Sequence, residues 1–304
     1  MANEQQAELQ PELICPICME AIAGASFTTE HIVPKALGST SAENTIRICK
    51  KCNSLLGSIV DIRLTEHPVV VGLRYEMKIL GRNGLPNPFG KRSVHYDKTP
   101  ITGSVSMDRN GDFVRFKADC KVIPLQNGMK IVCGPRKHIC GYANQYLRDK
   151  GLPPISQNEI DQHQLHITKK QPHYIGIDAS DAEIEESLVD TCPAIIKIAY
   201  EATYRQIGYS YLADETAAEI RCRLGAVLAG EETFIFPTDM SIAYQSVLRR
   251  RYTAISFYQQ ENQLIARVLL LGAIQIDVCV SNDYLGLELQ KHPESIIVFD
   301  ESQY

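Results

Sequence analysis

Four cysteines near the N-terminus are the residues of this 304-residue chain that most clearly indicate chemistry. They form two Cys-x-x-Cys pairs, Cys15 with Cys18 and Cys49 with Cys52, and 30 residues separate the pairs. Two such pairs are typical of a structural zinc site in which four thiolates bind one ion, whereas a redox site has a single pair. A unit this short cannot bury enough apolar surface to fold alone, so we expect Zn²⁺ to supply part of its stability.

Side chains suited to phosphodiester hydrolysis lie between and beside these pairs. Such a reaction needs a base to activate water, a cation to stabilise the developing negative charge, and a rigid arrangement of both. His31 can be the base, because an imidazole near its ordinary pKa accepts a proton at neutral pH. Glu30 projects to the side of an extended strand opposite His31, and Asn53 offers a carbonyl oxygen. These hard oxygen donors suit Mg²⁺ or Mn²⁺.

The pattern resembles the HNH (ββα-metal) endonuclease family, in a variant whose motif reads H-N-N. Residues 30–34, Glu-His-Ile-Val-Pro, look like the (D/E)-H-I-x-P strand of that family. Asn44 matches the middle asparagine, which ties the connecting loop to the hairpin, and Asn53 stands where the final histidine binds the divalent ion. The resemblance covers about residues 13–62 and is closest to the zinc-bearing subgroup. It implies a metal-dependent endonuclease that cuts DNA with His31, Glu30, Asn44 and Asn53 as catalytic residues.

Bacterial proteins of similar layout often act in restriction or anti-phage defence, so the resemblance implies that setting here. Two alternatives stay open on the sequence. One is an effector that degrades nucleic acid only when a nucleotide or a partner protein engages its C-terminal region. The other is a zinc-ribbon module that binds DNA and has no catalytic activity.

Charge is distributed unevenly along the chain. Residues 1–60 carry a net charge of −2, residues 61–150 carry +8 and residues 151–304 carry −11. The basic segment suits a polyanion, because neutralised phosphates release counterions. We expect DNA contacts from six cations in and beside the motif, namely Lys35, Lys50, Lys51, Arg82, Lys91 and Arg92. The acidic segment suits a regulatory, sensing or self-associating role, and we expect a homodimer or a larger assembly.

The chain as a whole predicts an α+β fold, with a small zinc-stapled ββα unit followed by a larger mixed α+β domain. The expected divisions are a disordered lead-in (1–12), the HNH unit (13–62), a basic strand-rich region (63–150) and an acidic region (151–304). No apolar run reaches the roughly 18 residues of a membrane span, and the first residues lack a signal-peptide pattern, which favours a cytoplasmic location.

Helices and strands are predicted from apolar periodicity and from Gly and Pro positions. We expect a helix over most of residues 61–79, with Pro68 either near its start or at a break, a helix that begins near 192 and ends at 207, and another over 215–228. Within the second of these, residues 193–201 are interpreted as core. Residues 252–257 and 264–280 are expected to form an apolar hairpin.

Overall fold

In the computed structural model, the chain folds into two compact units. The larger unit comprises residues 1–82 and 179–304, and the smaller unit comprises residues 83–178. The structure describes residues 12–23, 26–39, 42, 44–81, 83–89, 94–95, 102–124, 130–134, 136–162, 181–231, 241–244, 252–283 and 297–300. The expected lead-in therefore lies outside the described residues apart from Glu12. Helices and strands occur in both units, which confirms the α+β class.

The N-terminal part of the larger unit is built from short elements. A first hairpin is formed by β1 (Glu12–Ile14) and β2 (Ala21–Ala23), and a second by β3 (Phe27–His31) and β4 (Thr45–Cys49), with the short turn η2 (Lys35–Leu37) between the last two strands. Helix α1 (Lys50–Leu55) follows β4 directly and continues through a π-helical segment, η3 (Leu56–Asp61), into α2 (Ile62–Thr65). The chain thus contains the strand–strand–helix order that the motif predicts.

The helix predicted over residues 61–79 is interrupted, and its end was placed too late. Helix α3 spans Pro68–Glu76 and starts with Pro68 in its first turn, where the missing N–H group costs no hydrogen bond. The residues that separate α3 from α2 are Glu66 and His67. The imidazole of His67 contacts the carbonyl of Ser187 at 2.9 Å through Nε2, which ties this region to the second part of the larger unit.

The C-terminal part of the larger unit is a five-stranded antiparallel sheet covered by helices. The helices are α6 (Asp181–Ser187), α7 (Cys192–Ile207) and α8 (Glu215–Leu228), with the turns η4 (Leu188–Thr191) and η5 (Gly208–Ala213) before and after α7. The strands are β10 (Ser241–Tyr244), β11 (Tyr252–Gln260), β12 (Gln263–Leu270), β13 (Ile274–Ser281) and β14 (Ile297–Asp300), in the order β10-β13-β12-β11-β14. The bounds predicted for α7 and α8 are confirmed.

The apolar hairpin is confirmed, but its second arm is two strands and not one. Strand β11 pairs with β12, as predicted, and β12 then pairs with β13. The turn between β12 and β13 contains Leu271 at φ 53° and Gly272 at φ 59°. Leu271 is 1% exposed. An uninterrupted apolar run conceals such a turn, because a buried turn needs no polar residue to mark it.

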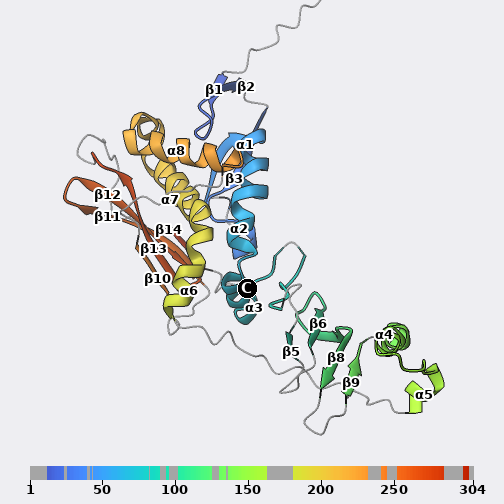
Figure 1. The fold of residues 1–304 in the computed structure, drawn as a ribbon. Helices are drawn as coiled ribbons and strands as arrows, with labels where there is room; N and C mark the ends of the chain where they lie inside the picture. The colour runs from blue at the N-terminus through green and yellow to red at the C-terminus, as the bar shows by residue number, and fades with distance from the viewer. Residues whose placement is uncertain are drawn as a thin grey trace, which may run out of the picture. The chain divides into compact units, whose positions relative to one another are not determined.

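Helix α7 lies between the sheet and the N-terminal helices (Figure 1) and contacts β12 and β13 on one side and η3 and α2 on the other. Every residue from Cys192 to Thr203 is buried. A helix that is buried all round belongs to a core rather than to a surface. The apolar core is continuous from the N-terminal elements through α7 to the sheet. The boundary expected at residue 62 therefore falls inside one compact unit.

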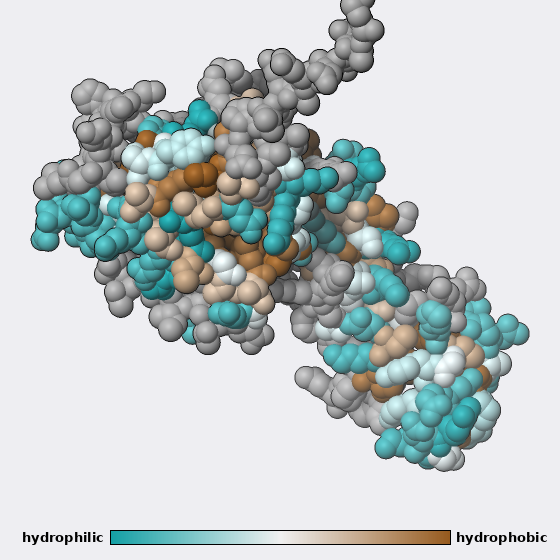
Figure 2. Space-filling model, turned by 90° about the horizontal axis from the view of Figure 1, so that it is seen from above, coloured by the Kyte–Doolittle hydropathy of each residue, from teal (hydrophilic) through white to brown (hydrophobic). Residues whose placement is uncertain are grey.

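Among its described residues, the smaller unit holds short strands and helices. Strands β5 (Val94–His95), β6 (Thr102–Met107) and β7 (Phe113–Ala118) form one antiparallel sheet, and β8 (Lys121–Pro124) and β9 (Lys130–Cys133) form another. Helices α4 (Arg136–Asp149) and α5 (Gln157–Gln162) follow. Hydrophilic residues predominate on the face of this unit that Figure 2 shows. The boundary expected at residue 150 lies inside this unit.

Among the described residues, no helix is both long enough and apolar enough to cross a membrane.

The shared core leads to a prediction about the N-terminal segment in isolation. A fragment of residues 1–82 is expected to be unfolded or aggregated, because the side chains of Leu56, Val60 and Leu64, each 0% exposed, would lose the cover of α7. Circular dichroism and size-exclusion chromatography of the zinc-loaded fragment check this. A monomeric fragment with a cooperative thermal transition would contradict the prediction.

Candidate active site and metal centre

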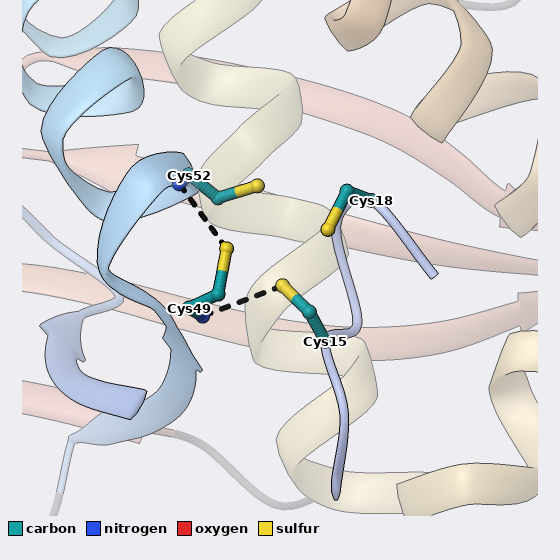
Figure 3. Close-up of side chains that lie close together, drawn as sticks. All are labelled: Cys15, Cys18, Cys49 and Cys52. Carbon is teal, nitrogen blue, oxygen red and sulfur yellow. Dashed lines mark hydrogen bonds between the residues drawn. The ribbon is translucent and has the colours of Figure 1, made fainter. Parts of the chain in front are cut away.

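The four cysteines of the two pairs meet at one point. Their Sγ atoms all lie within 4.8 Å of one another, and Figure 3 shows them pointing into a common centre from the Cys15–Cys18 turn and from the start of α1. Four sulfurs around a tetrahedral Zn²⁺ at about 2.3 Å would lie about 3.8 Å apart, so the group fits that ion after a small contraction. Among the described residues, this is the group of three or more His, Cys, Asp or Glu side chains whose ligand atoms lie close enough to share one ion.

Backbone hydrogen bonds prearrange these sulfurs. The N–H of Cys49 donates to Sγ of Cys15 at 3.4 Å, and the N–H of Cys52 donates to Sγ of Cys49 at 3.3 Å (Figure 3). Cys49 is also the N-cap of α1, because its side chain accepts the bond from Cys52. The residue that would bind zinc thus also starts the helix that carries Asn53.

Because the thiols lie close together, the pKa of each depends on whether its neighbours are ionised. A hydrogen bond from the thiol of Cys52 lowers the pKa of Cys15 to about 4, and the same contact raises the pKa of Cys52. Burial raises the pKa of Cys18 to about 11. Several thiolates can share such a small volume only when a cation neutralises their charge. A bound Zn²⁺ would supply that positive charge.

The second hairpin and α1 bring the remaining motif residues together. In the antiparallel pairing of β3 with β4, Glu30 lies opposite Ile46 and His31 opposite Thr45. The side-chain amide of Asn53 donates to Oγ1 of Thr28 at 2.8 Å and to the carbonyl of Thr29 at 3.2 Å. Since both bonds use the nitrogen, the Asn53 carbonyl oxygen is the atom left to serve as a ligand. Alternation along β3 puts Glu30 on the same face as Thr28.

Asn44 connects the loop to the hairpin through its backbone. Its carbonyl accepts the N–H of Ile32 at 3.2 Å, directly after the end of β3. Oγ1 of Thr45 donates to the carbonyl of Ala42 at 2.8 Å, which fixes the same loop from the other side. The Asn44 contact uses only the backbone, which any residue at position 44 could supply, so the role that the resemblance implies for the Asn44 side chain stays a prediction.

His31 is partly exposed at the end of β3, and its environment favours the neutral imidazole. Burial lowers the pKa of His31, and the positive charges of Lys35 and Lys197 lower it further. Its Nδ1 atom is buried and has no hydrogen-bond partner among the described residues. A neutral imidazole can accept a proton, so the state that a general base requires is the one favoured here.

Glu30 is only 7% exposed, and its carboxylate pairs with a lysine that lies 167 residues further along the chain. Oε1 of Glu30 accepts a hydrogen bond from the ammonium of Lys197 on α7. The same ammonium donates to Asp61, at the end of η3, at 3.2 Å. Burial raises the pKa of Glu30, and the charge of Lys197 opposes that effect.

Two further side chains of α7 hold the N-terminal elements. The hydroxyl of Tyr200 donates to the carbonyl of Pro16, inside the first cysteine pair. The guanidinium of Arg205 donates to the carbonyl of Thr45 at 2.9 Å, at the start of β4. Helix α7 therefore contacts the zinc-binding turn, the site hairpin and the buried carboxylates.

Lys197, Asp61, Tyr200 and Arg205 are the residues near the site that the motif does not reveal. One sequence signal was available, because Lys197 and Glu201 interrupt an otherwise apolar stretch. Lysine and glutamate are almost never fully buried unless they are paired. The stretch does lie in the core, as predicted, but its charged residues have partners in the candidate site.

The cations expected to contact DNA are only partly described. Lys35 lies in η2, and Lys50 and Lys51 lie in the first turn of α1, and all three are exposed. Arg82, Lys91 and Arg92 lie outside the described residues. Within the smaller unit, Arg109, Arg115, Lys117, Lys121 and Arg148 are exposed.

Comparison with known proteins gives one match. Residues 15–69 match the family model described as HNH endonuclease. The match contains the four cysteines and every motif residue from Glu30 to Asn53, and it leaves most of α3 and everything after it unmatched. No curated protein and no solved structure matches the chain. The motif, the strand–strand–helix geometry and the zinc-binding arrangement of the cysteines agree with this match of residues 15–69 to the HNH endonuclease family.

Proposed function

We propose that this protein is a metal-dependent endonuclease that hydrolyses phosphodiester bonds in DNA. The observation that carries the proposal is the joint placement of His31, Asn53 and Glu30 on the β3–β4 hairpin and α1, next to a four-cysteine cluster. A zinc-binding scaffold alone would not require a neutral imidazole, a carboxamide and a carboxylate within one hairpin–helix unit. Exposed Lys35, Lys50 and Lys51 supply positive charge around it.

The oxygen donors of the site fit a hard divalent cation. The Asn53 amide bonds Thr28, whose side chain shares a face of β3 with Glu30. The Asn53 carbonyl oxygen and the Glu30 carboxylate are ligands of the kind that Mg²⁺ or Mn²⁺ prefers, together with water and phosphate oxygens. When bound, the cation would stabilise negative charge on the phosphate and on the leaving oxygen. His31 takes the proton from the attacking water, and Asn44 keeps the loop after β3 in place.

Nicking of supercoiled plasmid tests the proposal. The full-length, zinc-loaded protein is expected to convert supercoiled plasmid to the open-circular form in Mg²⁺ or Mn²⁺ and to be inactive in EDTA. A parallel assay on single-stranded RNA tests the preference for DNA. Failure to cut any nucleic acid under these conditions would favour the zinc-ribbon alternative. Activity that appears only after a nucleotide or a cell extract is added would favour the triggered effector.

Asn53 can be tested against a neighbour that shares its hydrogen bond. Asn53→Ala removes the carbonyl ligand and the bonds to Thr28 and to the Thr29 carbonyl, whereas Thr28→Val removes only the bond between the two side chains. We expect Asn53→Ala to raise the Mn²⁺ concentration for half-maximal nicking at least about 10-fold, the cost typical of losing support at a metal site. Thr28→Val should stay within about 2-fold of the wild type. Equal shifts for the two variants would show that the hydrogen bond, and not the ligand, matters.

The acidic charge of residues 151–304 supports a proposal about assembly. One HNH site cuts one strand, so a double-strand break needs two sites or two visits. An acidic region is repelled by DNA and is freer to contact protein, and closed symmetric dimers are the commonest assemblies. We expect light scattering over a concentration series to give a dimer mass. A monomer that still cuts both strands efficiently would contradict this.

The cellular setting is the last part of the proposal. The layout supports a role in bacterial restriction or anti-phage defence, and phage plating on cells with and without the protein tests it. Cells carrying His31→Ala are the matched control.

A further inference from the structure

The strongest candidate outside the matched residues is the buried ammonium of Lys197. Lys197 is 0% exposed and lies on α7, far in sequence from the HNH unit. Its Nζ contacts the carboxylates of Glu30, of Asp61 at 3.2 Å and of Glu201 at 3.6 Å. Glu30 comes from the site hairpin, and Asp61 ends the π-helical segment that continues α1. One ammonium therefore connects the two elements between which the site is formed.

The ammonium of Lys197 supplies positive charge to a buried cluster of three carboxyl groups. Burial alone would lower the pKa of Lys197, but the carboxylates of Glu201, Asp61 and Glu30 raise it above its ordinary value. Burial raises the pKa of Glu201 well above its ordinary value, and neither oxygen of Glu201 has a hydrogen bond among the described residues. The ammonium hydrogen-bonds to Glu30 and Asp61, whereas the carboxylate of Glu201 lies 3.6 Å away.

We propose that Lys197 is a positioning residue of the nuclease site, which holds the Glu30 carboxylate in the place from which it serves the divalent ion. This inference rests on the proposed function and adds a residue that lies outside residues 15–69. Lys197 bonds Oε1 of Glu30, which leaves Oε2 to face a cation. Groups that orient a metal ligand in this way typically change metal affinity 10- to 100-fold when they are removed.

A matched pair of variants isolates the ammonium. Glu201→Gln keeps the shape of residue 201 and removes its charge, and Glu201→Gln with Lys197→Met differs from it only in the ammonium. We expect calorimetric titration of the full-length, zinc-loaded proteins with MnCl₂ to show at least about 10-fold weaker Mn²⁺ binding for the double variant. The Mn²⁺ concentration for half-maximal nicking should rise by a similar factor.

Tyr200→Phe separates positioning from packing. Tyr200 lies on the same helix and also bonds the N-terminal elements, through the carbonyl of Pro16, but it does not touch Glu30. Loss of the Tyr200 hydroxyl should lower the midpoint of thermal unfolding without changing Mn²⁺ binding. A merely structural Lys197 would behave like Tyr200, with a lower midpoint and normal Mn²⁺ affinity.

Several outcomes would overturn the inference. A folded double variant that binds zinc normally, and that binds Mn²⁺ as tightly as Glu201→Gln, would do so. If the double variant does not fold, Asp61→Asn replaces it, because it removes the negative charge that lies 3.2 Å from the ammonium. Unchanged Mn²⁺ binding by folded Asp61→Asn would then overturn the inference. Mn²⁺ binding without nicking by the wild type would overturn the proposed function instead, and the binding comparison would still decide the role of Lys197.

Discussion

Replacing His31 by alanine is expected to lower the rate of divalent-dependent nicking at least about 100-fold. The loss of a positioned general base typically costs a factor of roughly 10² to 10⁴. The fold should persist, because the ring is only partly buried and its Nδ1 atom has no hydrogen-bond partner among the described residues. Single-turnover nicking at saturating Mn²⁺ measures the chemical step without interference from product release.

The same substitution at an exposed histidine provides the control. His138 lies in α4 of the smaller unit, and His138→Ala should leave the rate unchanged. Zinc content, the unfolding midpoint and DNA binding of His31→Ala should match the wild type. Rates within 3-fold of the wild type for His31→Ala would reject His31 as the base.

Cys15→Ser is expected to release zinc and to lower the midpoint of thermal unfolding by at least about 10 °C. A structural zinc site contributes on the order of 10 kcal/mol, and each kcal/mol shifts the midpoint of a unit of this size by about 2–4 °C. The wild type should contain one zinc per chain, whereas the variant should contain much less. Plasma emission spectrometry and scanning calorimetry measure the two effects.

Cys222→Ser is the matched control, since Cys222 is exposed on α8 and lies outside the cluster. It should keep its zinc and its midpoint. A folded Cys15→Ser variant that retains both would contradict the four-thiolate site. Loss of nicking in Cys15→Ser would follow indirectly, because Cys49 of the same site caps the helix that carries Asn53.

The contacts of α7 tie the HNH unit to the rest of the larger unit. Residues 15–69 match the family, yet Lys197, Tyr200 and Arg205 bond the carboxylate of Glu30 and the carbonyls of Pro16 and Thr45. The unit therefore shares its core with elements more than 100 residues away and is not a detachable module. Any change that shifts α7 within the larger unit would reach the site through these bonds.

The sequence by itself determined the features that depend on local spacing. The two cysteine pairs predicted the zinc-binding cluster, because each knuckle is formed by four consecutive residues. The resemblance of the motif of Glu30, His31, Asn44 and Asn53 to the HNH family predicted the hairpin and helix, and apolar periodicity placed α7 and α8. Turn residues that take a positive φ inside an apolar run, such as Leu271, gave no such signal.

Only the tertiary structure decided what surrounds Glu30. The sequence shows a charged residue before a histidine, and it cannot show that the carboxylate is buried against a lysine 167 residues away. Likewise, the division of the chain at residues 82/83 and 178/179 depends on α7 returning to the N-terminal helices. Contacts between residues far apart in the sequence depend on which faces of the helices and strands pack together. Local patterns along the chain do not reveal these contacts.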